Sequence, residues 1–305
     1  MNRRNINLDD FVKKDKLGKG SYGEVYKILK KSTKEVYAAK YLQLYESSKK
    51  SINREIQIMA NLIHPTIAKL IGFNVTDIDH EQYQVTIVME MAENGSLRSI
   101  LKDCDNTKRQ IILVGIARGM MFLHQNKVIH CDLKPDNILI DKDFKPHITD
   151  FGLSKFTKII SNLSDSLNFR GSPYYMAPEV IKDESNNVKS DVYSFGIIMF
   201  EVITGQKPYP EDINLYTLLN KVSEQNYRPT FPDDFKNESL KKLICQCWDK
   251  NPENRPTFED IFNKLAYNHN KNYDLFESNQ CYYLDNVDIK KVHKYAHEIN
   301  YYDEY

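Results

Sequence analysis

The period of the hydrophobic pattern changes part-way along this chain of 305 residues, and that change restricts the fold more than any other feature. From Phe11 to about Met91, short runs of the β-strand type surround one helical stretch. From Leu97 to about Tyr267, apolar residues mostly recur at helical spacing. The sequence therefore predicts an α+β protein, with a β-rich part followed by a larger, mainly helical part. No segment of about 20 to 50 residues repeats, which argues against a solenoid.

Charge and hydropathy argue against two classes of partner. The chain has 42 Lys and Arg residues against 42 Asp and Glu residues, so no excess of either sign draws it to nucleic acid or to an anionic membrane surface. The first residues lack the apolar core of a secretory signal. The most apolar run, from Val192 to Thr204, contains Ser194 and Glu201 and is shorter than the roughly 20 residues that a membrane helix needs. We therefore predict a buried core helix there and no membrane insertion.

The cysteines are few and odd in number. They are Cys104, Cys131, Cys245, Cys247 and Cys281. The only close pair is spaced C-x-C, which favours reduced thiols over a disulfide framework or a zinc site. Since reduced thiols are typical of the cytosol, we expect a cytoplasmic protein.

A lysine stands on an apolar strand face in the β-rich part. Lys40 shares this face with Ala38 and Leu42, because alternate residues of a strand point the same way. The apolar face of the helix that follows is formed by Ile52, Ile56, Met59 and Ile63. Glu55 lies on the same helix face, where a buried carboxylate needs a partner such as Lys40. The alternative is that Glu55 lies at the edge of this face in contact with water.

The helical part shows its own stripes and stop signals. One apolar stripe is formed by Ile112, Ile116, Met120 and Leu123. We expect Thr107 to be the N-cap of that helix. The buried helix after Asp191 ends at Gly205, with prolines close behind. Residues 268–305 predict one more helix, around Val287 to Ile299, to which the sequence assigns no role.

A glycine-rich run, Leu17-Gly-Lys-Gly-Ser-Tyr-Gly-Glu-Val25, follows the first expected strand. This G-x-G-x-x-G spacing also occurs in dinucleotide-binding turns, but those turns continue directly into a helix. Here Val25 to Leu29 has strand composition, which favours a hairpin. Glycines allow such a hairpin to lie close over phosphate groups.

Several further runs, in their order along the chain, decide the family. They are His130-Cys-Asp-Leu-Lys-Pro-Asp-Asn137, Asp150-Phe-Gly152, Gly171-Ser-Pro-Tyr-Tyr-Met-Ala-Pro-Glu179, Asp191-Val-Tyr-Ser-Phe-Gly196 and Arg255-Pro-Thr-Phe258. With the glycine-rich run, they resemble the motifs of eukaryotic protein kinases. The last two are similar to the tyrosine-kinase-like group, whose members mostly phosphorylate serine and threonine.

The resemblance implies a two-lobed kinase fold with a small antiparallel β-sheet lobe. The implied divisions are an extension at 1–10, a kinase domain at 11–267 and a tail at 268–305. Within the domain, the N-lobe covers 11–91, the hinge 90–95 and the C-lobe 95–267. ATP with Mg²⁺, or alternatively Mn²⁺, would bind between the lobes, and the partner would be a protein substrate with a serine or threonine acceptor. The oligomeric state does not follow from the resemblance.

The resemblance also assigns chemical roles. Lys40 would contact the α- and β-phosphates and be held by Glu55. Asp132 would orient the incoming hydroxyl and take its proton, while Lys134 would neutralise charge near the γ-phosphate. A lysine two residues after the catalytic aspartate, as at Lys134, is typical of the family's serine/threonine kinases. The metal ligands would be Asn137 and Asp150.

An adenine pocket is implied by the run from Val85 to Ala92. Met89 would guard its back, and the backbone of Glu90 and Ala92 would meet the adenine edge. The ring would lie between Val25, Ala38 and Leu139, with the nucleotide covered by Leu17, Gly18, Gly20 and Gly23. Each apolar residue could equally belong to the core.

Other family positions are structural. Glu179 and Arg255 resemble a buried ion pair. Asp191 would fix the backbone of the catalytic loop, although an N-cap role for its helix fits the sequence equally well. A core stack is implied for Met59, Leu70, His130 and Phe151.

One position departs from the family pattern. Cys131 replaces the arginine that usually precedes the catalytic aspartate and pairs with a phosphorylated activation segment. Ser51 stands where another cation often lies, and Lys155 is the cation that remains nearby. The nearest acceptors in that segment would be Ser161, Ser164 and Ser166. We therefore expect little dependence of activity on phosphorylation there. No residue for the chemistry itself is lost, which disfavours a pseudokinase scaffold.

Overall fold

The computed structural model describes residues 5–20, 23–77, 83–156, 172–182, 186–268 and 281–304. The chain forms two compact units. The first unit runs to Ile63 and adds Ile67–Glu93 and Thr149–Gly152, whereas the second contains His64–Thr66, Asn94–Ile148 and the chain from Leu153 onward. This arrangement confirms the predicted two-lobed α+β fold.

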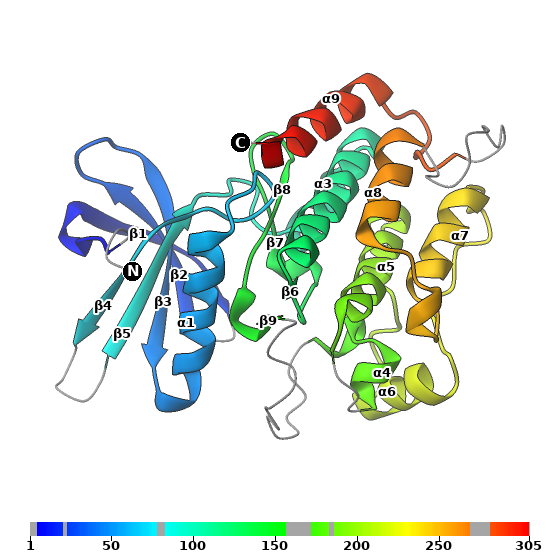
Figure 1. Cartoon of the computed structure of the whole chain (residues 1–305), viewed down its shortest axis with the longest axis horizontal. Coiled ribbons are helices and arrows are strands. Elements are labelled where there is room, and N and C mark those ends of the chain that lie inside the picture. The colour runs from blue at the N-terminus through cyan, green and yellow to red at the C-terminus, as the bar shows by residue number, and fades with distance from the viewer. Residues whose placement is uncertain are drawn as a thin grey trace. The chain divides into compact units, whose positions relative to one another are not determined.

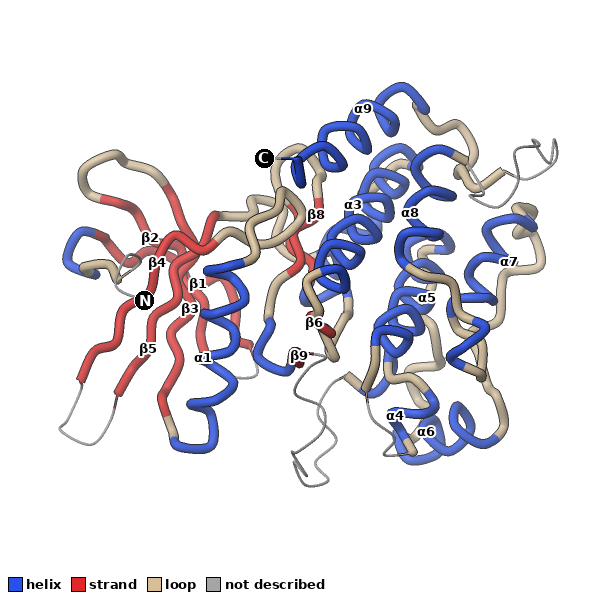
Figure 2. The backbone as a smooth tube through the Cα atoms, in the orientation of Figure 1, coloured by secondary structure: helices blue, strands red, loops and turns tan. Residues whose placement is uncertain are grey.

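The first unit is built on an antiparallel sheet whose strand order is β1-β2-β3-β5-β4 (Figure 1). Its strands are β1 (Phe11–Gly20), β2 (Gly23–Lys30), β3 (Val36–Leu44), β4 (Leu70–Asp77) and β5 (Tyr83–Glu90), after a 3₁₀ turn at Leu8–Asp10. Ile28, Ala39 and Val88 form a buried cluster on this sheet. Figure 2 shows helix α1 running beside the strands.

Helix α1 (Glu46–Asn61) buries the predicted face only in part. Ile52 and Met59 are buried as expected. Ile63 lies beyond the end of the helix and is exposed, so its inclusion in the apolar face was wrong. Ile58 is buried instead, and the predicted Ile56 is only half-buried.

The second unit is mostly helical. Its longer helices are α3 (Asn106–Gln125), α5 (Val188–Thr204), α6 (Leu215–Glu224), α7 (Glu238–Cys247), α8 (Phe258–Tyr267) and α9 (Ile289–Asn300), with the short helices α2 (Leu97–Ile100) and α4 (Pro178–Ile181). Short strands form two pairs, β6 (Val128–Ile129) with β9 (Lys155–Phe156) and β7 (Ile138–Ile140) with β8 (Pro146–Ile148).

Helix α5 is the predicted buried core helix. Its run from Val192 to Ile203 is almost entirely buried. Gly205 ends the helix in the left-handed region, at φ +70°, where glycine has no Cβ to clash. Across the described part of the chain, no helix has both the length and the apolar character that crossing a bilayer requires.

Helix α3 confirms its predicted stripe, because Ile112, Ile116, Met120 and Leu123 are fully buried. The predicted N-cap was wrong. The Asp105 carboxylate caps the helix by accepting from the Lys108 N–H at 2.8 Å. Thr107 Oγ1 instead accepts from the Asp288 N–H at 3.0 Å, a contact with a distant segment that periodicity does not reveal.

The predicted late helix is confirmed as α9, which packs on α3 and α8 within the second unit (Figure 1). Its buried residues are Val292, Tyr295, Ala296 and Ile299. The backbone before the helix is held by side chains of other elements. Gln110 donates to the Tyr282 carbonyl and accepts from the Leu284 N–H, and Asn237 donates to the Tyr283 carbonyl.

Candidate active site

A triad of charges lies within the first unit, with Lys40 and Glu55 buried and Asp150 half-buried. Lys40 of β3 is 2.7 Å from a carboxylate oxygen of Glu55 on α1 and 3.3 Å from one of Asp150. The Lys40 and Glu55 side chains are 9% and 3% exposed, so the alternative of a water-exposed Glu55 was wrong. Asp150 has φ +63°, outside the usual range for an L-residue.

The electrostatics of the triad favour a charged lysine. Burial alone would lower the pKa of Lys40, but the carboxylates of Glu55 and Asp150 outweigh it and hold this pKa above its ordinary value. Complete burial raises the pKa of Glu55, and the Lys40 ammonium opposes that rise. Lys40 is therefore a fixed positive charge whose position is set from two sides.

Helix α1 also holds the segment after Asp150. Ser51 Oγ donates to the Gly152 carbonyl at 2.6 Å, and Arg54 Nη1 donates to the same oxygen at 3.3 Å. Neither residue was predicted to have this role. Ser51 precedes Glu55 by four residues, so helical spacing places both on one side of α1, and this was the available signal.

The pairing of β2, β3 and β5 brings several first-unit residues of the predicted adenine pocket onto neighbouring positions of the sheet. Val25 is paired with Lys40, and Ala38 is paired with Met89. Since Ala38 and Lys40 are two residues apart on β3, these four side chains share one face of the sheet. Ala38 and Met89 are 6% and 5% exposed.

The glycine-rich run forms the predicted hairpin, with Gly18 opposite Val25 and Gly20 opposite Gly23. A Cβ at Gly23 would lie 1.9 Å from the Tyr41 carbonyl oxygen, so this glycine is required for the approach of β3. Leu17 is exposed at 44%.

The remaining adenine-pocket residues lie in different parts of the chain. The Glu90 N–H donates to the Lys69 carbonyl at 3.1 Å, and the half-buried Ala92 follows β5. Leu139 lies in the second unit, on β7, and is also half-buried. A role for these residues at an adenine ring stays a prediction.

The catalytic loop of the second unit is held by Asp191 of α5. Its carboxylate accepts from the backbone N–H of His130 at 2.9 Å and of Cys131 at 3.0 Å. His124 Nε2 lies 2.8 Å from the same carboxylate. The alternative N-cap role was wrong, because Asn187 caps α5. The buried aspartate thus fixes the loop backbone at Cys131, where φ is +68°.

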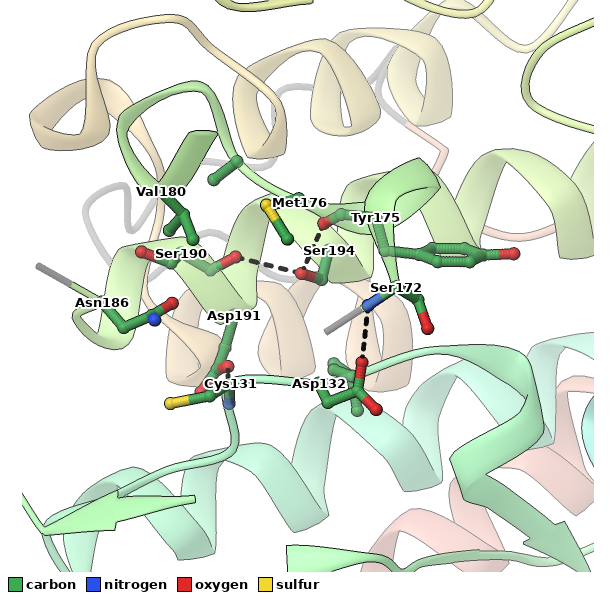
Figure 3. A pocket seen from close by; sticks show the side chains of 12 residues that line it. Cys131, Asp132, Ser172, Tyr175, Met176, Val180, Asn186, Ser190, Asp191 and Ser194 are labelled. Atoms are coloured by element: carbon green, nitrogen blue, oxygen red, sulfur yellow. Dashed lines mark hydrogen bonds between the residues drawn. The ribbon is translucent and has the colours of Figure 1, made fainter. Parts of the chain in front are cut away.

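Asp132 receives donors from three directions. Lys134 Nζ is 2.8 Å from its Oδ2, and Asn137 Nδ2 is 3.0 Å from the same oxygen. The Ser172 N–H donates to its Oδ1 at 2.9 Å (Figure 3). Lys134 also donates to Ser172 Oγ at 2.7 Å. Ser172 was not singled out from the sequence, because nothing in a linear pattern places it beside a residue 40 positions earlier.

A small pocket adjoins Asp132. Figure 3 shows Cys131 and Asp132 on one side of it and Tyr175 and Met176 on the other. The Cys131 side chain is half-buried. The predicted acceptors Ser161, Ser164 and Ser166 lie outside the described residues.

The predicted structural ion pair is confirmed. Arg255 contacts both carboxylate oxygens of Glu179, at 2.6 and 2.8 Å, and both side chains are buried. Ser190 of α5 donates to the same carboxylate at 3.1 Å. The predicted stack residues Met59, Leu70, His130 and Phe151 are all buried.

The two residues predicted as metal ligands, Asn137 and Asp150, carry the oxygen atoms that a hard divalent cation prefers. The Asn137 amide nitrogen donates to the Asp132 carbonyl at 2.8 Å as well as to its carboxylate, which leaves the amide oxygen as the group for a metal. Asp150 supplies a carboxylate in the first unit. Mg²⁺ prefers a few such oxygens and completes its coordination with phosphates and water.

The comparison with known families agrees with this geometry. The protein kinase domain family matches residues 11–265. The chain therefore belongs to the protein kinase family.

Its relatives differ in the specificity that their names state. Dual specificity protein kinase shkB of Dictyostelium discoideum is 36% identical over 256 residues, which cover 81% of this chain and 38% of that protein. A probable serine/threonine-protein kinase of the same organism is 32% identical, with 84% and 51% covered. Tyrosine-protein kinase SPK-1 of Girardia tigrina is 32% identical, with 89% and 57% covered. The chain spans less than two thirds of each of these relatives.

Proposed function

We propose that the chain is a serine/threonine protein kinase that transfers the γ-phosphoryl group of ATP to protein hydroxyl groups. The observation that carries this proposal is the double contact of Lys134, which reaches both Asp132 and Ser172. The contact places one cation beside the proposed base and beside the segment that follows Gly171. A tyrosine-specific kinase would be expected to carry a residue other than lysine at the position of Lys134.

Asp132 is the proposed base. With its carboxylate fixed by Lys134, Asn137 and Ser172, it accepts a hydrogen bond from the substrate hydroxyl and so orients the oxygen toward phosphorus. Asp132 takes the hydroxyl proton as the new P–O bond forms and the bond to the ADP oxygen breaks. Lys134 offsets the negative charge that develops on the transferred group.

Lys40 is the proposed contact to the α- and β-phosphates, and Glu55 keeps its ammonium in place. Asn137 and Asp150 would hold Mg²⁺, or alternatively Mn²⁺. When bound, such a cation neutralises charge on the phosphate oxygens. The residues of the proposed adenine pocket are those of the predicted set, from Leu17 and Val25 to Met89, Glu90, Ala92 and Leu139.

The second candidate is a dual-specificity or tyrosine kinase. The names of two relatives favour it, since shkB is named a dual specificity kinase and SPK-1 a tyrosine kinase. A pseudokinase is disfavoured because Lys40, Asp132, Asn137 and Asp150 are all present. A cytoplasmic location stays a prediction.

The test is phosphoamino-acid analysis. Purified protein is incubated with labelled ATP, a divalent cation and a generic protein substrate, with Asp132→Asn as the inactive control. We expect label on serine and threonine, and a much weaker signal from Ser172→Ala, in which Lys134 loses one of its two contacts. Label found mainly on tyrosine would overturn the serine/threonine assignment, while a wild type no more active than Asp132→Asn would overturn the kinase activity.

A further inference from the structure

Strand β8 leads directly to the proposed metal ligand, because Asp150 follows Ile148 by two residues. The Ile148 N–H donates to the Thr66 carbonyl at 2.8 Å. Both residues also pack closely on α3, since a Cβ at Gly119 would lie 2.5 Å from Thr66 Oγ1 and 2.8 Å from Ile148 Cδ1. The position of β8 therefore depends on the turn at residues 64–66.

His64 connects that turn to α9. His64 Nδ1 lies 2.7 Å from Thr66 Oγ1 and 3.2 Å from the Thr66 backbone nitrogen, whose N–H donates to it. Nε2 in turn donates to the Ile299 carbonyl at 3.2 Å. The ring is 4% exposed and stacks on Phe122 at 4.7 Å. His64 thus binds the turn with one nitrogen and the end of α9 with the other.

Helix α9 also reaches the start of β8. A Cβ at Gly115 would lie 2.4 Å from Pro146 Cγ and 2.5 Å from Tyr295 Oη, so both residues occupy the same small space on α3. Lys145 pairs with Glu298 at 3.1 Å. α9 consequently supports β8 at both ends, directly at Pro146 and through His64 at Ile148.

We propose that His64 is a positioning residue through which α9 fixes β8 and hence the backbone that carries Asp150. Helix α9 lies beyond residues 11–265, which match the protein kinase domain family, and packs on α3 and α8 within the second unit. The proposal rests on the proposed function for the role of Asp150. It gives α9 a supporting role for the proposed active site, exerted through His64 and Tyr295.

Two variants separate the bonds of His64. In His64→Asn the side-chain oxygen still accepts from the Thr66 N–H, as in an Asx turn, but the bond to Ile299 is lost. In His64→Gln the longer side chain keeps a donor for the Ile299 carbonyl. Lys294→Ala, at an exposed position of α9, is the matched control. Tyr295→Leu removes the hydroxyl that shares the space beside Gly115 with Pro146, and it carries the test if His64→Asn does not fold.

Three measurements are made well below the unfolding temperature of every variant. They are amide exchange over residues 146–150, the Kd of a non-hydrolysable ATP analogue with Mg²⁺, and kcat. In His64→Asn and Tyr295→Leu we expect amide exchange over residues 146–150 to be at least fivefold faster, with exchange in α7 unchanged. We also expect the Kd of the analogue to be at least fivefold higher and kcat at least fivefold lower. Lys294→Ala should stay within twofold of wild type, and His64→Gln, which keeps the bond to Ile299, should lose less than His64→Asn.

A lower unfolding temperature with wild-type exchange, Kd and kcat in His64→Asn would overturn the proposal. Equal loss in His64→Asn and His64→Gln would also overturn it, because the bond to Ile299 would not be the cause. A wild type that transfers no phosphate would refute the proposed function instead, and the exchange measurement would still decide the role of His64.

Discussion

The buried pair Lys40–Glu55 offers a quantitative test of the site, because each partner has a different environment when the other is removed. Lys40→Met leaves Glu55 buried, without its cation and near the like charge of Asp150. Glu55→Gln leaves Lys40 with Asp150 at 3.3 Å, so the ammonium keeps one carboxylate. The double variant removes both charges of the pair.

The expected free energies of unfolding follow from these environments. Removing one partner of a buried pair costs about 3–5 kcal/mol, and we assign Lys40→Met the lower end because Glu55 can take up a proton. Glu55→Gln should cost about 1–2 kcal/mol, since a hydrogen-bonded amide replaces the carboxylate. The double variant should be less destabilised than the sum of the two by about 1–3 kcal/mol.

Urea unfolding of all four proteins at one pH, with kcat/KM measured in parallel, checks this prediction. The same sign of coupling is expected in kcat/KM, because in the proposed mechanism Glu55 would act on the phosphates only through Lys40. Well-folded single variants whose effects add within about 0.5 kcal/mol would show that the two side chains do not act as a pair.

Three further predictions concern other parts of the site. Asp132→Asn should leave binding of an ATP analogue close to wild type and lower kcat by about 10²- to 10⁴-fold, and retention of a third of the turnover would refute the base assignment. Glu179→Gln should lower the free energy of unfolding by about 3 kcal/mol in urea titrations, because it leaves the buried Arg255 without its counter-charge. Glu211→Gln, an exposed control, should unfold at the same urea concentration as the wild type. Joint replacement of Ser161, Ser164 and Ser166 by alanine should change kcat/KM by less than about tenfold, and so should phosphatase treatment of the wild type. In Cys131→Arg, by contrast, kcat/KM should depend on phosphorylation of the activation segment.

The sequence was most informative where a residue's partners lie close along one element. Alternation placed Lys40 on an apolar face, and helical spacing placed Glu55 on another. Whether the two meet depended on the burial of α1 against the sheet, which a linear pattern does not contain. The buried core helix and its glycine stop were predicted correctly, because burial on all sides and a left-handed C-cap both leave local signals.

The errors and omissions share a different origin. Thr107 was a reasonable cap, but its hydroxyl is bonded to the Asp288 N–H, which lies far along the chain. Ser172 was passed over because its contact with Asp132 also joins distant segments. Such contacts are made by tertiary packing, and residue type alone supplies little information about them.

The substitution at Cys131 shows how backbone and side-chain functions separate at one position. The unusual backbone there is held by the Asp191 carboxylate, which accepts from the Cys131 N–H, and any residue other than proline supplies that donor. Asp132 receives its own donors from Lys134, Asn137 and Ser172. None of these bonds involves the side chain at position 131. Loss of the arginine therefore removes a charge without removing the geometry of the catalytic loop, which is why we expect the change to affect regulation and not phosphoryl transfer.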